Sequence, residues 1–183
     1  GAGGGASGGA APRAASGGTA GNGAGGKSRT DTVNGMSGRA AACRRTKGAG
    51  GTWAAAYLGA YGGGLGVTDT SEDGVGDSHT VDNIGRDNFV LFEFSQPVTV
   101  NRAFLGYVVS DSDLSIWTGN AVNPYVNHLN LSDTVLAGLA RRANLTTSPP
   151  TRWAALNPGP AAGNLPLRAC SLDGTPPETH CQG

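Results

Sequence analysis

Two apolar stretches, Asn88-Phe-Val-Leu-Phe-Glu-Phe94 and Pro97-Val-Thr-Val-Asn-Arg-Ala-Phe-Leu-Gly-Tyr-Val-Val109, decide the fold class of this 183-residue chain. Successive side chains of an extended strand point to opposite faces, and here both faces are largely apolar. The turn at 95–97 places Pro97 at the start of the second strand, where its missing N–H does least harm. The pattern predicts two covered strands of an antiparallel sheet.

Alternation within the first stretch assigns its two faces. One face carries Phe89, Leu91 and Glu93, and the other carries Val90, Phe92 and Phe94. An apolar character on both sides is typical of an inner strand of a β-sandwich.

The flanking segments extend this β pattern and add one helix. Residues 114–118 predict a short third strand, and residues 151–156 can return as a last one. Residues 52–58 fit either a strand or a short helix. Residues 131–142 predict a helix capped by Asn130 or Ser132. The predicted fold is therefore mainly β, an antiparallel, jelly-roll-like sandwich with one short helix.

Composition divides the chain into three parts. Residues 1–50 are rich in Gly, Ala and Arg without apolar periodicity, which predicts disorder. Residues 51–164 form the predicted sandwich domain, and residues 165–183 a Pro-rich irregular tail without a closing strand. Within 1–50, seven Lys or Arg residues stand against Asp31 alone. Such a tail can bind an anionic polymer or remain solvated, and the lack of interleaved aromatics argues against nucleic acid.

The cysteines and the hydropathy limit the cellular setting. Cys43, Cys170 and Cys181 form neither a disulfide framework nor a zinc motif, although Cys170 and Cys181 could pair in an oxidising compartment. No window approaches the roughly 18 apolar residues of a membrane span. We therefore expect no membrane span in this chain.

The acidic loop after residue 68 is the candidate metal site. Oxygen-bearing side chains alternate and are followed by glycine, as in the first half of a calcium loop. Thr80 stands where a bidentate glutamate would be expected. The alternative interpretation is a solvated acidic loop without a metal. The candidate ligands are Asp69, Ser71, Asp73, Asp77 and Asp82.

Aromatic side chains provide a second candidate site, for carbohydrate. Trp117 and Tyr125 are the aromatics we expect beside the acidic loop, whereas core packing is the simpler role for aromatics in a sandwich. No nucleophile motif accompanies the three histidines, so we expect no enzyme. Hydrolysis by Asp77, His79 and Asp82 is the least favoured hypothesis.

Several segments together resemble a known bacterial group. They are Ala56-Tyr-Leu-Gly-Ala-Tyr61-Gly-Gly-Gly-Leu-Gly-Val-Thr-Asp69, His79-Thr-Val-Asp-Asn83-Ile-Gly-Arg-Asp87, Phe104-Leu-Gly-Tyr-Val-Val-Ser-Asp-Ser-Asp-Leu-Ser-Ile-Trp117 and Arg152-Trp-Ala-Ala-Leu-Asn-Pro158. Across residues 50–158 the chain resembles exosortase-processed surface proteins of the PEP-CTERM type. The resemblance implies an exported β-sandwich of the Gram-negative envelope, associated with exopolysaccharide and biofilm.

The ends depart from that group, because the signal peptide and the C-terminal sorting tail are missing. We therefore expect a fragment, or a reading whose ends are out of frame. The favoured function is a non-enzymatic surface or matrix protein with a structural or adhesive role. The alternative is a calcium-assisted carbohydrate-binding module whose partner is extracellular polysaccharide.

Overall fold

A computed structural model describes residues 28–33, 35–72, 78–109, 114–145, 153–155, 165–170 and 180–182. These residues form antiparallel strands and one short helix, which confirms the predicted mainly β class. Within them, no helix has the length and apolar character that a membrane crossing requires.

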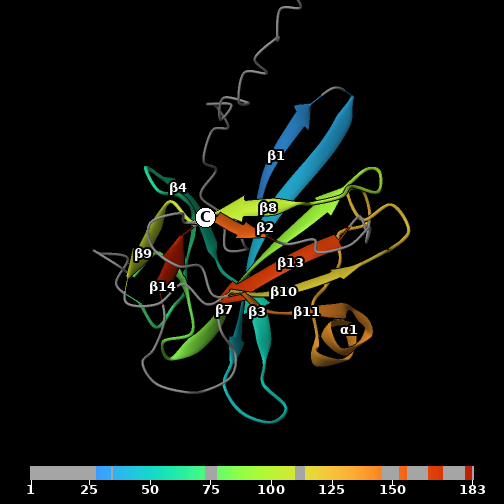
Figure 1. Cartoon of the computed structure of the whole chain (residues 1–183). Helices are drawn as coiled ribbons and strands as arrows, with labels where there is room; N and C mark the ends of the chain where they lie inside the picture. The colour runs from blue at the N-terminus through green and yellow to red at the C-terminus, as the bar shows by residue number, and fades with distance from the viewer. Residues whose placement is uncertain are drawn as a thin grey trace, which may run out of the picture.

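A large antiparallel sheet forms the frame of the molecule (Figure 1). Its strands run in the order β1-β2-β7-β13-β10-β11, and β3 also pairs with β2. Their bounds are β1 Ser28–Val33, β2 Met36–Thr46, β3 Trp53–Ala55, β7 Arg86–Phe94, β10 Leu114–Gly119, β11 Ala140–Leu145 and β13 Leu165–Cys170. The longest ladder joins β2 to β7, from Gly38 opposite Phe94 to Thr46 opposite Arg86.

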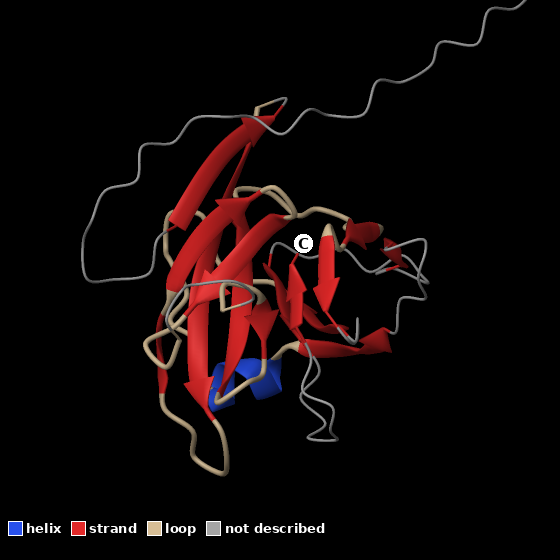
Figure 2. Cartoon of the chain, turned by 90° about the vertical axis from the view of Figure 1, so that its left-hand side faces the viewer, coloured by secondary structure: helices blue, strands red, loops and turns tan. Residues whose placement is uncertain are grey.

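Shorter strands form three further groups beside the large sheet (Figure 2). They are the pair β4 Tyr57–Tyr61 and β5 Gly64–Thr68, the trio β6 Val81–Asp82, β14 His180–Gln182 and β9 Tyr107–Val109, and the pair β8 Arg102–Phe104 and β12 Trp153–Ala155. Because these groups are not hydrogen-bonded into one second sheet, the jelly-roll-like sandwich stays a prediction.

The two faces of β7 bury two separate hydrophobic clusters, as alternation predicted. Val90 packs with residues of the small strands, including Leu58, Val67 and Ala103. Phe89 and Leu91 pack on the other face with Trp117 and Leu131, next to α1 Asp133–Gly138. The large sheet is therefore covered by small strands on one side and by the α1 region on the other.

The prediction of disorder for residues 1–50 is wrong for the described part. β1 and β2 lie within it, and β2 is hydrogen-bonded to β7 along nine residue pairs. The small side chains of Ala40, Ala41 and Ala42 are buried there. Because each alanine is only weakly hydrophobic, the sequence pattern did not indicate a core strand. The neighbouring strands stabilise it. Residues 1–27 lie outside the described residues.

The prediction that residues 165–183 hold no closing strand is also wrong. β13 lies between β7 and β10, and β14 pairs with β6 and β9. Pro166 is tolerated because the pairing with β7 begins only at Leu167. The side chains of Cys170 and Cys181 lie outside the described ones, so their pairing stays a prediction.

Two predicted elements are shorter than expected. The stretch 98–109 is divided into β8 and β9 at Leu105 and Gly106, where a Cβ on the glycine would lie 1.8 Å from the Gly63 carbonyl oxygen. The helix begins after Ser132, whose hydroxyl accepts from the Val135 N–H at 3.1 Å. It ends at Gly138 rather than at residue 142, because the following residues pair with β10 as β11.

The remaining strand predictions agree with the structure. Residues 52–58 adopt the strand alternative, as β3 and the start of β4. β10 covers the predicted strand 114–118 and extends to Gly119, and β12 lies within residues 151–156.

Candidate functional site

The described part of the predicted calcium loop is organised around the buried carboxylate of Asp69. Its Oδ1 accepts hydrogen bonds from the Ser71 N–H at 2.6 Å and from the Ser71 hydroxyl. Arg86 Nη1 donates to the same oxygen at 2.9 Å and to Thr70 Oγ1 at 2.8 Å. Arg86 thus supplies a positive charge to one of the predicted metal ligands.

Two more carboxyl groups lie beside Asp69. The Asp69 N–H donates to Glu72 Oε2 at 2.6 Å. Burial raises the pKa of Glu72 to about 7, against the opposing effect of that hydrogen bond, and the nearby Asp82 and Asp69 raise it further. Asp82 accepts from Thr80 Oγ1 at 3.1 Å and from the Ile84 N–H at 3.0 Å.

The predicted metal ligands are therefore only partly assembled. The structure brings Asp69 and Ser71 together, and it places Asp82 beside Glu72. Asp73 and Asp77 lie outside the described residues. In the part of the chain that the structure describes, no three His, Cys, Asp or Glu side chains converge as metal ligands would. Asp69 forms an ion pair with Arg86 within the loop, and the calcium site stays a prediction because two of its ligands are not described.

His79, the central residue of the hydrolytic hypothesis, stacks on a neighbouring ring. Its imidazole lies 4.1 Å from the Tyr61 ring centroid, with 21° between the planes. Its proposed partner Asp82 is held by its own loop, and Asp77 is not described.

Trp117 and Tyr125, the two predicted carbohydrate-binding aromatics, pack against other residues than those of the acidic loop. Trp117 is only 5% exposed and packs in the core with Phe89, at 6.2 Å between ring centroids. With so little of its surface exposed, this ring is not an open platform on the surface of the protein. Tyr125 is half-buried under the guanidinium of Arg39, which lies 5.6 Å from its ring centroid and donates to its carbonyl at 2.8 Å.

A buried glutamate connects the Tyr125 segment to the sheet. Glu93, fully buried on β7, accepts from the Leu129 N–H at 2.7 Å, and its Oε2 lies 2.6 Å from His128 Nδ1. Arg39 Nη1 lies 3.9 Å from the same oxygen. These contacts fasten residues 120–131 across the face of β7, which is a structural role.

An exposed aromatic surface lies on β8 and β12 instead. Trp153 stands opposite Phe104 in the strand register, and each side chain is 46% exposed. Their rings lie 5.0 Å apart at 52°, and the Arg102 guanidinium lies 4.2 Å from the Trp153 centroid. We call these three residues, Arg102, Phe104 and Trp153, the Phe104–Trp153 surface.

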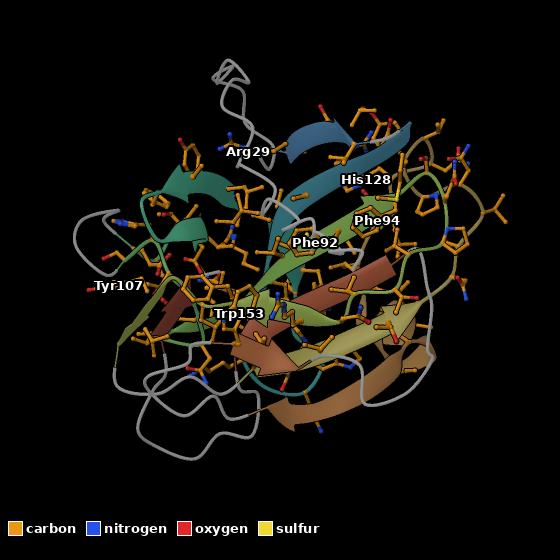
Figure 3. The ribbon with its side chains drawn as sticks, turned by 45° about the horizontal axis from the view of Figure 1, so that its top comes forward. Arg29, Phe92, Phe94, Tyr107, His128 and Trp153 are labelled. Carbon is orange, nitrogen blue, oxygen red and sulfur yellow. The ribbon has the colours of Figure 1, made fainter. Side chains whose placement is uncertain are left out.

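The two strands turn this surface outward because their opposite faces are buried. Ala103 and Ala154, which alternate with the exposed residues, pack in the core. Figure 3 labels Trp153 and, apart from it, Tyr107, an exposed ring from another of the small strand groups. The alternation Arg102-Ala-Phe104 carried the signal for an exposed face, but the sequence did not show which of its two faces is covered.

Comparison with known proteins assigns no relative to this chain: no protein-family model, no curated protein and no solved structure matches it.

Proposed function

We propose that this chain is a non-enzymatic, adhesive protein of the bacterial cell surface or extracellular matrix, and that it binds polysaccharide through the Phe104–Trp153 surface. The exposure of two contacting aromatic rings on the outside of a small sheet is the observation that carries the proposal. Contiguous apolar area that a domain leaves uncovered is typical of an interaction site.

Polysaccharide fits the chemistry of this surface. Sugar rings present apolar C–H faces that can cover an indole or phenyl ring, while their hydroxyl groups remain hydrated. Arg102, beside Trp153, presents donors that can bind sugar hydroxyls or the carboxylates of an acidic sugar. The location of the protein at the bacterial cell surface is also part of this proposal, and it rests on the resemblance to the PEP-CTERM group.

Retention of the full chain in gels that contain polysaccharide tests the proposal. Gels with an acidic polymer (alginate) and a neutral polymer (dextran) would compare the wild type with Trp153→Ala and Phe104→Ala. Tyr57→Ala is the matched control, because Tyr57 is exposed to a similar degree but lies on β4. Thermal unfolding would establish that each variant is folded.

We expect at least one polymer to retard the wild type and the Tyr57 variant. Each change on the Phe104–Trp153 surface should weaken retention by about 1–2 kcal/mol, which is roughly 5- to 30-fold. Equal retention of all four folded proteins would refute the proposed surface. Retardation of the wild type by neither polymer would contradict the polysaccharide assignment.

A further inference from the structure

A cleft of about 560 Å³ lies between the β2 end of the large sheet and α1. Its volume is within the range of small-molecule sites in proteins. Its polar lining consists of Arg45, Lys47, Asn83, Asp87 and Asp133, and its apolar wall comes from Trp117, Leu136 and Ala137. The cleft lies on the α1 side of the sheet, away from the small strands that carry the Phe104–Trp153 surface.

Two residues of the polar lining, Arg45 and Asp133, are bound to each other. Arg45 Nε and Nη2 donate to the two carboxylate oxygens of Asp133 at 2.7 and 2.9 Å. The Trp53 indole N–H donates to the same carboxylate at 2.7 Å. These hydrogen bonds lower the pKa of Asp133 to about 2, so it stays ionised and committed to Arg45. Arg45 also donates to the Gly48 carbonyl.

Asp87 also lines the cleft, and its contact with Arg45 is longer than that of Asp133. Its buried carboxylate lies 3.6 Å from Arg45 Nη1, which is longer than an ordinary hydrogen bond. Burial raises the pKa of Asp87, while Arg45 and Lys47 act in the opposite direction. A carboxylate removed from water in this way gains from a ligand that donates hydrogen bonds to it.

The charges of the cleft favour a neutral ligand. Arg45 and Lys47 supply two positive charges, and Asp87 and Asp133 supply two negative ones. A ligand with net charge would therefore find no net counter-charge. Hydroxyl groups can donate to Asp87 and accept from Lys47, and a C–H face can lie against the wall formed by Leu136 and Ala137.

We infer that this cleft binds a neutral, polyhydroxylated ligand of mono- or disaccharide size, with Asp87 as the hydrogen-bond acceptor for its hydroxyl groups. The cleft is separate from the Phe104–Trp153 surface, and binding in it does not depend on the polysaccharide proposal.

Ligand-observed NMR titration of the full chain with neutral sugars tests this inference. The probes are glucose, galactose, mannose, N-acetylglucosamine, sucrose and lactose. Ala137→Trp would fill the cleft from an exposed helix position, and Thr134→Trp places the same bulk on α1 outside the lining. Asp87→Asn keeps the shape of the acceptor and removes its charge.

We expect saturable binding of at least one sugar to the wild type and to the Thr134 variant. Binding should be lost in Ala137→Trp and weakened about tenfold or more in Asp87→Asn. Absence of saturable binding to the wild type by every sugar at millimolar concentration would overturn the inference. Undiminished binding to folded Ala137→Trp would do the same. Tyr57→Ala, outside the lining of the cleft, should leave sugar binding unchanged. Loss of sugar binding in Ala137→Trp with retention on the polysaccharide gels kept separates this result from the polysaccharide test.

Discussion

Replacement of Glu93 by alanine should cause one of the largest losses of stability available in this chain. Glu93 is fully buried, and its carboxylate fastens the 120–131 segment through Leu129 and His128. Removal of the carboxylate leaves the Leu129 N–H without its acceptor and leaves Arg39 facing an apolar gap.

The size of the loss in unfolding free energy depends on how well water can solvate the partners of Glu93 after the carboxylate is removed. Breaking a buried charged pair costs about 3–5 kcal/mol. Here the side chains of Arg39 and His128 are 23% and 41% exposed, so water can reach them after the change. We therefore expect the lower end, about 3 kcal/mol, and a fall in Tm of roughly 6–12 °C for a chain of this size.

Matched variants separate the contributions in urea and thermal unfolding. Glu93→Gln keeps an acceptor for the Leu129 N–H and should lose about 1–2 kcal/mol. His128→Ala should lose less than that, because its ring is partly solvated. Hydrogen exchange at the Leu129 amide should accelerate most in Glu93→Ala. A loss below about 1 kcal/mol in Glu93→Ala, or one no larger than that of His128→Ala, would refute this reasoning.

Three further changes test the packing and the acidic loop. Phe89→Ala removes a fully buried ring between two tryptophans and should lower the free energy of unfolding by about 3–5 kcal/mol in urea titration; a loss under about 1 kcal/mol would contradict that packing. Gly66→Ala would place a Cβ 1.9 Å from the His79 carbonyl oxygen and should lower Tm clearly, whereas Gly62→Ala meets nothing within 4 Å and should change Tm little; equal effects would refute the close approach. Burial raises the pKa of Glu72 from its ordinary value of 4.5 to about 7, so the folded protein binds more protons than the unfolded chain in that range. Its contribution to stability should therefore decline as the pH rises from about 4.5 through 7. Glu72→Gln should flatten the decline, and an unchanged pH profile of unfolding would show that the raised pKa is wrong.

The sequence predicted best where large apolar side chains alternate. β7 carries Phe89, Val90 and Leu91 in succession, and each face has its own buried cluster as predicted. Such strands bury enough apolar area on both sides that local pattern and tertiary environment agree.

β2 and β13 were not predicted as strands, because their stability comes from the strands that they pair with. Ala40 and Ala42 contribute little hydrophobicity individually, and the second residue of β13 is a proline. Both strands pair with β7, which is distant in sequence from each of them. Strand propensity is judged from neighbouring residues, whereas a sheet ladder joins strands that are distant in sequence. A prediction from composition alone therefore placed these segments in disordered ends.

The sequence indicated candidate site residues but not where the fold places them. The acidic loop was interpreted as a calcium site or as a solvated loop, and the sequence did not show that Arg86, seventeen residues from Asp69, pairs with that carboxylate. Aromatics were interpreted as core residues or as a sugar site, and the sequence did not show that Trp117 faces a core while Trp153 faces outward. Exposure depends on which side of a sheet is covered, and that is set by strands far apart in the chain.

The most direct test of the proposed function is the indole N–H spectrum of the full chain during titration with oligosaccharides of the retained polymer. The chain has three tryptophans, and the Trp53 indole is held by Asp133. Assignment by single tryptophan substitutions would identify each signal. The proposal predicts that the Trp153 signal shifts in a saturable way, in the Asp87→Asn variant as in the wild type. A Trp153 signal that does not move while oligosaccharide binds, with shifts confined to Trp53 or Trp117, would contradict it.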